Sequence, residues 1–206
     1  GGVATLNGAG TRSIFSASTT MSGGRFNIFC DLTFENSGSA KLVELHQKNF
    51  IVRCTFQTNT TNGLTLDDNN VVYNCFFKKL GGPGTYALNC EGKQNIVMYS
   101  TFDKDTTAPK AMISVQGDPA SMVIGNIIKV DSTTHGIWMG ASKAIFINNS
   151  IASVGGSGKG ITGGSSSRQV TLINNAIQGF SATGAIGYDL QSNWKLMVFA
   201  GNISQN

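Results

Sequence analysis

An eight-residue pattern of apolar and polar positions recurs along almost the whole chain. The two most similar copies are AIFINNSI, which begins at residue 144, and VTLINNAI, which begins at residue 170. Eight such units begin at residues 27, 49, 70, 95, 121, 144, 170 and 196, with spacings of 21 to 26 residues. A variable period in the low twenties, with little helical periodicity, is typical of solenoids built from strands.

Within each unit the apolar places alternate as they do in a β-strand. The second, fourth and eighth places are nearly all apolar, and we expect them to face the interior. The eighth place holds Phe34, Phe56, Phe77, Phe102, Ile128, Ile151, Ile177 and Ile203. We expect these side chains to form a column in the core, with one side chain from each coil. At the sixth place, Asn126, Asn149 and Asn175 predict a ladder of amide hydrogen bonds between coils.

A second short strand is predicted upstream of most units. Its apolar alternation occupies residues 42–45, 63–66, 87–90, 112–115, 136–139, 160–163 and 185–188. Two strands per coil, with Gly, Ser, Thr and Pro between them, predict an all-β fold: a single-stranded parallel β-helix of about eight coils of 21–26 residues.

The β-helix is assigned to residues 27–206, and residues 1–26 are expected to form an irregular start, a partial cap or part of a coil. The last unit finishes at Ile203, which would leave the final coil uncovered. We therefore expect the sequence to be a fragment of a longer protein, or the final coil to be covered by another chain or domain.

The third place of the unit is expected to face outward. It is nevertheless apolar in all eight units: Phe29, Ile51, Val72, Val97, Val123, Phe146, Leu172 and Val198. An outward apolar stripe over eight coils would run on the order of 38 Å, which is too long to leave in contact with water. We expect a homotrimer about the long axis, or another segment of a longer chain, to cover it. The alternative is that these residues are present only because they favour strands.

Composition narrows the classes of function. The 206 residues include 26 Gly, only 13% are charged and the formal net charge is +4, which disfavours helices and gives no basic footprint for nucleic acid. No apolar stretch is long enough to cross a bilayer, so no membrane insertion is expected. The four cysteines show no metal-binding spacing, and we expect free thiols and neither a metal nor another cofactor.

Candidate chemistry lies just after the second strand, where side chains should face solvent. Adjacent coils would bring Asp67 and Glu91 to about 5 Å in the strand-pairing direction, close enough for the paired carboxylates of a retaining glycosidase. Asp68 is the third catalytic candidate. The candidate substrate-binding residues are Glu44, His46, Gln116 and Trp138. The indole of Trp138 would offer a flat apolar face to a sugar ring.

A purely structural interpretation of these residues stays open. Acidic residues and Asn in the turns of a solenoid often satisfy backbone donors, and that alone would explain their presence here. His135, which precedes a predicted strand, is expected in a solvated loop.

The Asn-rich pattern N-x-x-I-x-N-N-x-I and the length of the coils resemble the right-handed, pectate-lyase-like parallel β-helix superfamily, over residues 27–203. The resemblance implies a scaffold that polysaccharide lyases, glycoside hydrolases and phage tailspikes share. Of the polygalacturonase-like motifs, Asp67-Asp68 matches one, whereas Thr134-His135-Gly136 lacks the first Gly of another. A lyase would hold calcium with carboxylates such as Asp67, Asp68 and Glu91, but no basic residue stands at the matching place of the next coils.

Three classes of function follow from the resemblance. The first is a phage tailspike or tail-fibre shaft on the virion tail, which binds a bacterial surface polysaccharide and acts on it as a depolymerase if the carboxylates are catalytic. The second is a secreted, monomeric polysaccharide hydrolase or lyase, which would be extracellular. The third is a structural spacer or adhesin without catalysis.

Overall fold

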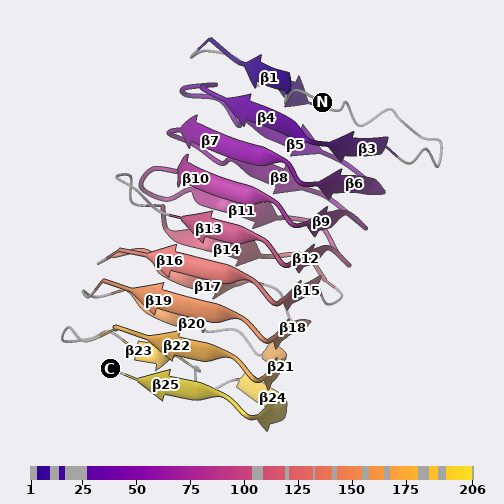
Figure 1. The fold of residues 1–206 in the computed structure, drawn as a ribbon. Helices are drawn as coiled ribbons and strands as arrows, with labels where there is room; N and C mark the ends of the chain where they lie inside the picture. The colour runs from indigo at the N-terminus through magenta and orange to yellow at the C-terminus, as the bar shows by residue number, and fades with distance from the viewer. Residues whose placement is uncertain are drawn as a thin grey trace.

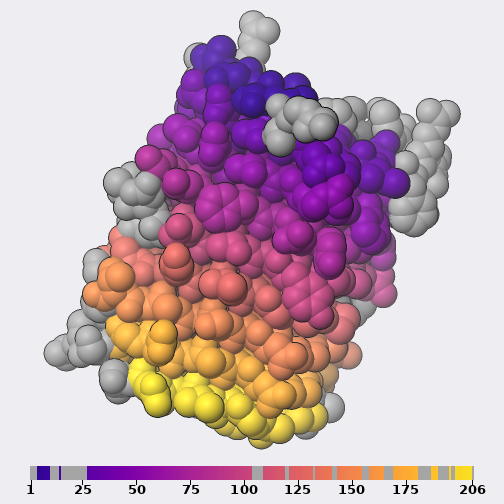
Figure 2. Space-filling view, viewed as in Figure 1, coloured from indigo at the N-terminus to yellow at the C-terminus, as the bar shows by residue number. Residues whose placement is uncertain are grey.

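The chain winds into a parallel β-helix (Figure 1). The computed structural model describes residues 4–9, 14–16, 27–103, 109–118, 121–131, 133–140, 143–154, 158–164, 168–180, 186–189 and 194–205. Over these residues the chain forms strands and no helix, and therefore no helix that could cross a membrane. Figure 2 shows the successive turns as layers stacked from the N-terminal to the C-terminal end. The predicted all-β solenoid is confirmed.

Three sheets run along the solenoid, and their strands pair in parallel with the equivalent strands of neighbouring turns. Sheet 1 consists of β1 (Ala4–Asn7), β4 (Leu32–Glu35), β7 (Thr55–Asn59), β10 (Phe76–Leu80), β13 (Thr101–Asp103), β16 (Ile127–Val130), β19 (Ser150–Ser153), β22 (Ala176–Gln178) and β25 (Ile203–Gln205). Sheet 2 consists of β2 (Phe15–Ser16), β5 (Val43–Leu45), β8 (Leu64–Leu66), β11 (Tyr86–Cys90), β14 (Ala111–Val115), β17 (His135–Met139), β20 (Lys159–Gly163) and β23 (Ile186–Tyr188). Sheet 3 consists of β3 (Asn27–Cys30), β6 (Asn49–Val52), β9 (Val71–Tyr73), β12 (Ile96–Met98), β15 (Ser121–Ile124), β18 (Lys143–Ile147), β21 (Arg168–Ile173) and β24 (Trp194–Ala200).

The number of turns is slightly smaller than expected. The eight predicted units begin in, or one residue before, the eight strands of sheet 3, and the seven predicted second strands correspond to β5 through β23 of sheet 2. The first and last strands of sheet 3, β3 and β24, are its edges and pair on one side only. Without the turns of these two edge strands, the solenoid has about 6 turns, whereas the number of units predicts eight coils.

Each eight-residue unit forms two strands, because a corner divides it. At this corner a residue with φ between 50° and 64° turns the chain from sheet 3 into sheet 1: Asp31, Arg53, Asn74, Tyr99, Gly125, Asn148, Asn174 and Gly201. Left-handed backbone is uncommon for residues other than Gly, Asn and Asp. Each turn consequently contains three strands, whereas the sequence predicts two.

The corner resets the alternation, because its left-handed residue does not take part in it. The third place is therefore buried in the six units from Ile51 to Leu172, whereas Phe29 in the first unit is partly buried and Val198, beyond the register shift of the last unit, is 44% exposed. The predictions that the third place faces outward, and that the second and fourth places face the core, are both wrong. The outward places of sheet 3 include Phe50 and Tyr73, each 39% exposed. The third-place stripe thus gives no support to the homotrimer that was expected from it.

A column of stacked phenylalanines fills the centre of the first turns. Ring centroids are 5.1 Å apart for Phe34 and Phe56, 4.9 Å for Phe56 and Phe77, and 4.4 Å for Phe77 and Phe102. All four rings are at most 1% exposed, and the column continues through Ile128, Ile151 and Ile177. The predicted column is confirmed up to Ile177.

The column does not continue to Ile203. A register shift between β21 and β24 follows Val170, and beyond it Ile177 pairs with Ser204. Ile203 is 58% exposed. A one-residue shift moves every side chain of a strand to the other face, which explains why the last unit departs from the pattern.

The predicted asparagine ladder is confirmed, and it extends by one turn. The side-chain amide Nδ2 donates to the next Oδ1 from Asn126 to Asn149 at 3.0 Å, from Asn149 to Asn175 at 2.9 Å and from Asn175 to Asn202 at 2.9 Å. A second ladder, at the first place of the unit, joins Asn27, Asn49, Asn70 and Asn95. The two ladders satisfy polar groups at two corners of the solenoid interior.

All four cysteines are free thiols, as expected. Cys54, Cys75 and Cys90 are buried, and burial raises the pKa of the Cys90 thiol to about 12. Cys30 differs, because it lies at an outward place at the edge of sheet 3 and is exposed. The three buried thiols therefore act as small core side chains.

The asparagine ladder predicts a large stability cost for a single truncation. Asn149→Ala removes the acceptor of the buried backbone N–H of Asn126, whereas the side-chain amide of Asn126 still donates to the carbonyl groups of Val97 and Ile124. We expect the free energy of unfolding to fall by about 1–3 kcal/mol, the cost of one unsatisfied buried group. Urea denaturation followed by circular dichroism measures the change. The exposed neighbour Ser150, changed to Ala, should alter stability by no more than about 0.5 kcal/mol. Equal losses in the two variants would contradict the ladder.

Candidate functional site

The outward face of sheet 2 carries a row of polar and aromatic side chains. The strand register places Glu44 beside Thr65, Thr65 beside Asn89, Asn89 beside Ser114 and Ser114 beside Trp138. Their neighbours in the strands are fully buried core residues, so by alternation this row faces away from the core. Thr65, Asn89 and Ser114 are nevertheless at most 2% exposed, so neighbouring side chains cover the middle of the row, and Glu44 and Trp138 at its two ends are partly exposed.

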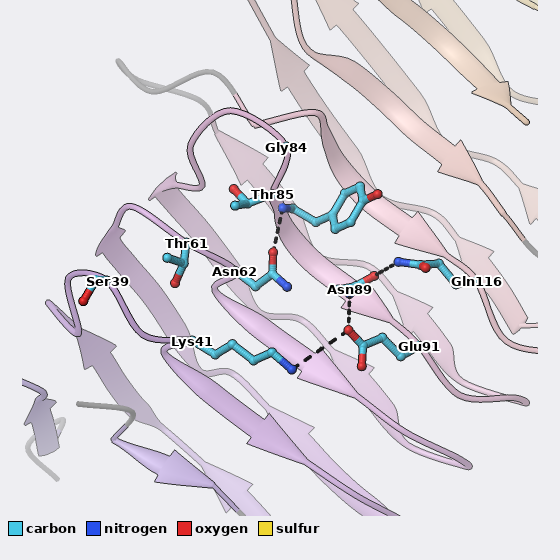
Figure 3. Close-up of a pocket in the computed structure, with 10 residues that line it drawn as sticks. Ser39, Lys41, Thr61, Asn62, Gly84, Thr85, Asn89, Glu91 and Gln116 are labelled. Atoms are coloured by element: carbon cyan, nitrogen blue, oxygen red, sulfur yellow. Dashed lines mark hydrogen bonds and ion pairs between the residues drawn. The ribbon is translucent and has the colours of Figure 1, made fainter. Parts of the chain in front are cut away.

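A cavity of about 430 Å³ opens on this face (Figure 3). It is lined by Ser39, Lys41, Thr61, Asn62, Gly84, Thr85, Tyr86, Asn89, Glu91 and Gln116. These residues come from β11 and from the turns that precede or follow β5, β8, β11 and β14. The cavity is shallow and largely open to solvent.

A chain of hydrogen bonds orients the polar groups of the cavity (Figure 3). Gln116 donates through Nε2 to Asn89 Oδ1 at 2.6 Å and to Ser114 Oγ at 3.1 Å. Asn89 in turn donates through Nδ2 to Glu91 Oε1 at 2.8 Å. Because the amides of Gln116 and Asn89 each donate to a neighbouring side chain, both side chains are held in defined positions before any ligand arrives.

Lys41 supplies the positive charge of the cavity. Its Nζ lies 2.7 Å from Glu44 Oε1 and 4.0 Å from Glu91 Oε1. Burial lowers the pKa of Lys41, but the hydrogen bond to Glu44 and the charges of Glu91, Glu44 and Asp67 outweigh it, so that the pKa is raised overall. The ammonium group therefore stays charged at neutral pH and links two carboxylates from different turns.

An aromatic platform adjoins the cavity. The rings of Tyr86 and Trp138 lie 6.1 Å apart with an interplanar angle of 26°, although β14 separates their strands. Lys110 Nζ lies 4.1 Å from the centroid of the Trp138 ring and 6.0 Å from that of Tyr86. This is the geometry of a cation–π contact.

Small residues leave room for this platform. Ala111 and Ser114, both fully buried, are the residues of β14 between the strands of Tyr86 and Trp138. A Cβ atom at Gly140 would lie 2.5 Å from Trp138 Cζ3 and 3.4 Å from Gln116 Cγ. Glycine is therefore needed here for the indole to lie beside Gln116, at the edge of the cavity.

The three predicted catalytic carboxylates have different partners. Asp67 Oδ2 contacts Nδ1 of His46, and Asp67 directly follows β8, as Glu91 follows β11. Glu91 lines the cavity and contacts Asn89 and Lys41. Asp68 accepts from the backbone N–H of Lys93 in the next turn at 2.9 Å. Asp68 thus has the structural role that the sequence left open, whereas Asp67 and Glu91 occupy equivalent places on adjacent turns.

The predicted binding residues lie on the same face. Glu44 contacts Lys41, His46 contacts Asp67, Gln116 lines the cavity, and Trp138 forms the platform. Among the described residues, no group of three or more His, Cys, Asp or Glu side chains could hold a metal ion.

Sequence reasoning gave no role to Lys41, Tyr86, Asn89 and Lys110. The one available signal was Asn89, a polar residue in the middle of an apolar strand. Tyr86 begins β11 and Lys110 precedes β14, so their proximity to Trp138 follows only from the register of three strands.

His135 is not the solvated loop residue that was expected. It begins β17, is half-buried, and its Nδ1 accepts from the backbone N–H of Lys159 at 3.1 Å. Burial lowers the pKa of His135, and the charges of Lys159 and Lys110 lower it further. The ring therefore serves as a hydrogen-bond acceptor between two turns.

Comparison with known proteins adds no assignment to this geometry. No protein-family model, curated protein or solved structure matches the chain. The fold and the chemistry of the face of sheet 2 therefore carry the functional argument.

Proposed function

We propose that the outward face of sheet 2 binds a polysaccharide. The observation that carries the proposal is the aromatic platform of Tyr86 and Trp138 next to a cavity with fixed hydrogen-bonding groups. A sugar ring offers an apolar face of C–H groups to an aromatic ring, and its hydroxyls bond to amides and carboxylates such as those of Gln116 and Glu91. Because the surface extends over several turns, it suits a polymer better than a single small molecule.

The polysaccharide is proposed to be a bacterial surface glycan, bound by a tailspike-like shaft on a virion tail. The support is the fold, since a β-helix is consistent with polysaccharide-binding proteins of the tailspike kind. A fold shared by many functions supports such an assignment only by analogy. The secreted hydrolase or lyase and the spacer without ligand are the competing functions.

Cleavage of the bound glycan is a second candidate function. It is favoured by the positions of Asp67 and Glu91, which follow the paired residues Leu66 and Cys90 on adjacent turns. In that function one carboxyl group would act as the acid and the other as nucleophile or base. His46 would orient the Asp67 carboxylate.

Removal of the indole is expected to weaken glycan binding. A screen on an array of bacterial surface polysaccharides selects the glycan, and titration calorimetry then compares wild type with Trp138→Ala. We expect a loss of about tenfold in affinity, or about 1.4 kcal/mol, since aromatic contacts contribute on the order of 1 kcal/mol. The control is Ile127→Ala, which removes a 52% exposed side chain from sheet 1. A wild-type chain that binds no glycan, or Trp138→Ala binding as tightly as wild type, would contradict the proposed site.

Catalysis is tested separately from binding. If the chain releases reducing ends from the selected glycan, Asp67→Asn and Glu91→Gln should each lower the rate by about 10²–10⁴-fold, as expected for loss of a catalytic acid or base. Asp103→Asn, on sheet 1, serves as the matched control. Unchanged rates in the two site variants would show that the carboxylates have been wrongly assigned. Binding without release of reducing ends would leave the chain a glycan-binding protein.

A further inference from the structure

A lysine lies over the indole of the aromatic platform. Lys110 directly precedes β14 and is exposed, and its Nζ is 4.1 Å from the centroid of the Trp138 ring. The ring of Tyr86 lies 6.0 Å from the same ammonium group. A sugar that stacks on Trp138 must therefore share the ring with this cation or displace it.

The charge of Lys110 is not balanced by a carboxylate. Two other lysines at the same edge of sheet 2 are paired: Lys41 contacts Glu44. Lys159, at the start of β20, contacts Asp189. Over the part of the chain that the structure describes, Lys110 forms no ion pair, and its ammonium group contacts the two aromatic rings instead. The platform thus carries a cation that is available to an anionic ligand.

The positive charge extends to the next strand. His135, at the start of β17, is half-buried, and the charges of Lys159 and Lys110 add to the effect of burial in lowering its pKa. The charge of Asp189 acts in the opposite direction and is outweighed. Two ammonium groups near one carboxylate leave this edge of sheet 2 with a net positive charge.

The carboxylate of the cavity lies at the other end of the strands. Glu91 follows β11 and Gln116 follows β14, whereas Lys110 precedes β14. A strand rises about 3.3 Å per residue, so the backbones of Lys110 and Gln116 lie on the order of 20 Å apart. A ligand that extends across the face therefore meets amides and a carboxylate at one end and a cation over an aromatic ring at the other.

We propose that Lys110 makes this face selective for a glycan with an anionic group, a carboxylate or a phosphate, on the sugar that lies on Trp138. The inference rests on the proposed glycan site and adds a requirement for charge. A neutral sugar has to displace the ammonium group from the ring and offers it no charge in return. An anionic sugar pairs with Lys110 as it takes the ring, and a charge-assisted hydrogen bond is at least as strong as an exposed cation–π contact.

Chemical removal of the ligand charge tests the inference. The acidic glycan that binds most tightly on the array of bacterial surface polysaccharides is reduced with carbodiimide and borohydride, which convert each carboxylate to a neutral hydroxymethyl group. For a phosphorylated glycan, removal of the phosphate with hydrofluoric acid takes the place of reduction. Titration calorimetry of wild type should show about tenfold weaker binding of the neutral form, the loss expected for one charge-assisted hydrogen bond. Lys110→Met should bind both forms equally, within about twofold, because neither the ion pair nor the competition for the ring remains.

Two further variants separate charge from structure. Lys110→Arg keeps the charge and should keep the preference for the acidic form. Lys129→Met removes an exposed lysine from sheet 1 and should bind both forms as wild type does. If Lys110 only holds the indole in place, Lys110→Met weakens binding of both forms alike and keeps the preference, which would overturn the inference. Selection of neutral glycans alone, or equal binding of the two forms by wild type, would also overturn it and leave the glycan site standing, whereas a wild type that binds no glycan overturns both.

Discussion

The structure depends on one constraint: each turn must present the same kind of side chain at the same place as the turns on either side. Parallel strands in register bring equivalent residues to one strand spacing, so a column of like side chains forms or fails as a unit. Phe56, Phe77 and Phe102 meet this constraint by stacking, and Asn149 and Asn175 meet it by passing hydrogen bonds from turn to turn. The near-repetition of the sequence is the consequence.

The same constraint explains how much of the fold could be predicted. The unit, the second strand, the aromatic column and the asparagine ladder follow from repetition alone. The inward and outward places of sheet 3 were predicted wrongly, because the corner at the fifth place of the unit, which resets the alternation, was not recognised. Six of the eight corner residues are Asn, Asp or Gly, the types that favour left-handed backbone, and this signal in the sequence was not used; only Arg53 and Tyr99 lack it. The misplacement of Ile203 has a different cause, a register shift without a sequence mark.

The candidate site was predicted in outline and not in detail. Trp138, Gln116 and Glu91 belong to one surface because strand alternation and the period place them there. The partners of each carboxylate depend on side-chain conformation, so the contacts of Asp67 with His46 and of Asp68 with the backbone of Lys93 were beyond a pattern argument. The interior thus holds the turns together, and sheet 2 carries the proposed glycan site.

A double-mutant cycle on the phenylalanine column tests the register most directly. Phe56 and Phe77 are in contact, whereas Phe77 stands between Phe56 and Phe102. With Phe→Leu substitutions, the free energies of unfolding should show a coupling of about 0.5–3 kcal/mol for Phe56 with Phe77, and additivity within about 0.5 kcal/mol for Phe56 with Phe102. Additive effects for Phe56 and Phe77, or a larger coupling for Phe56 and Phe102, would contradict the stacking on which the structure rests.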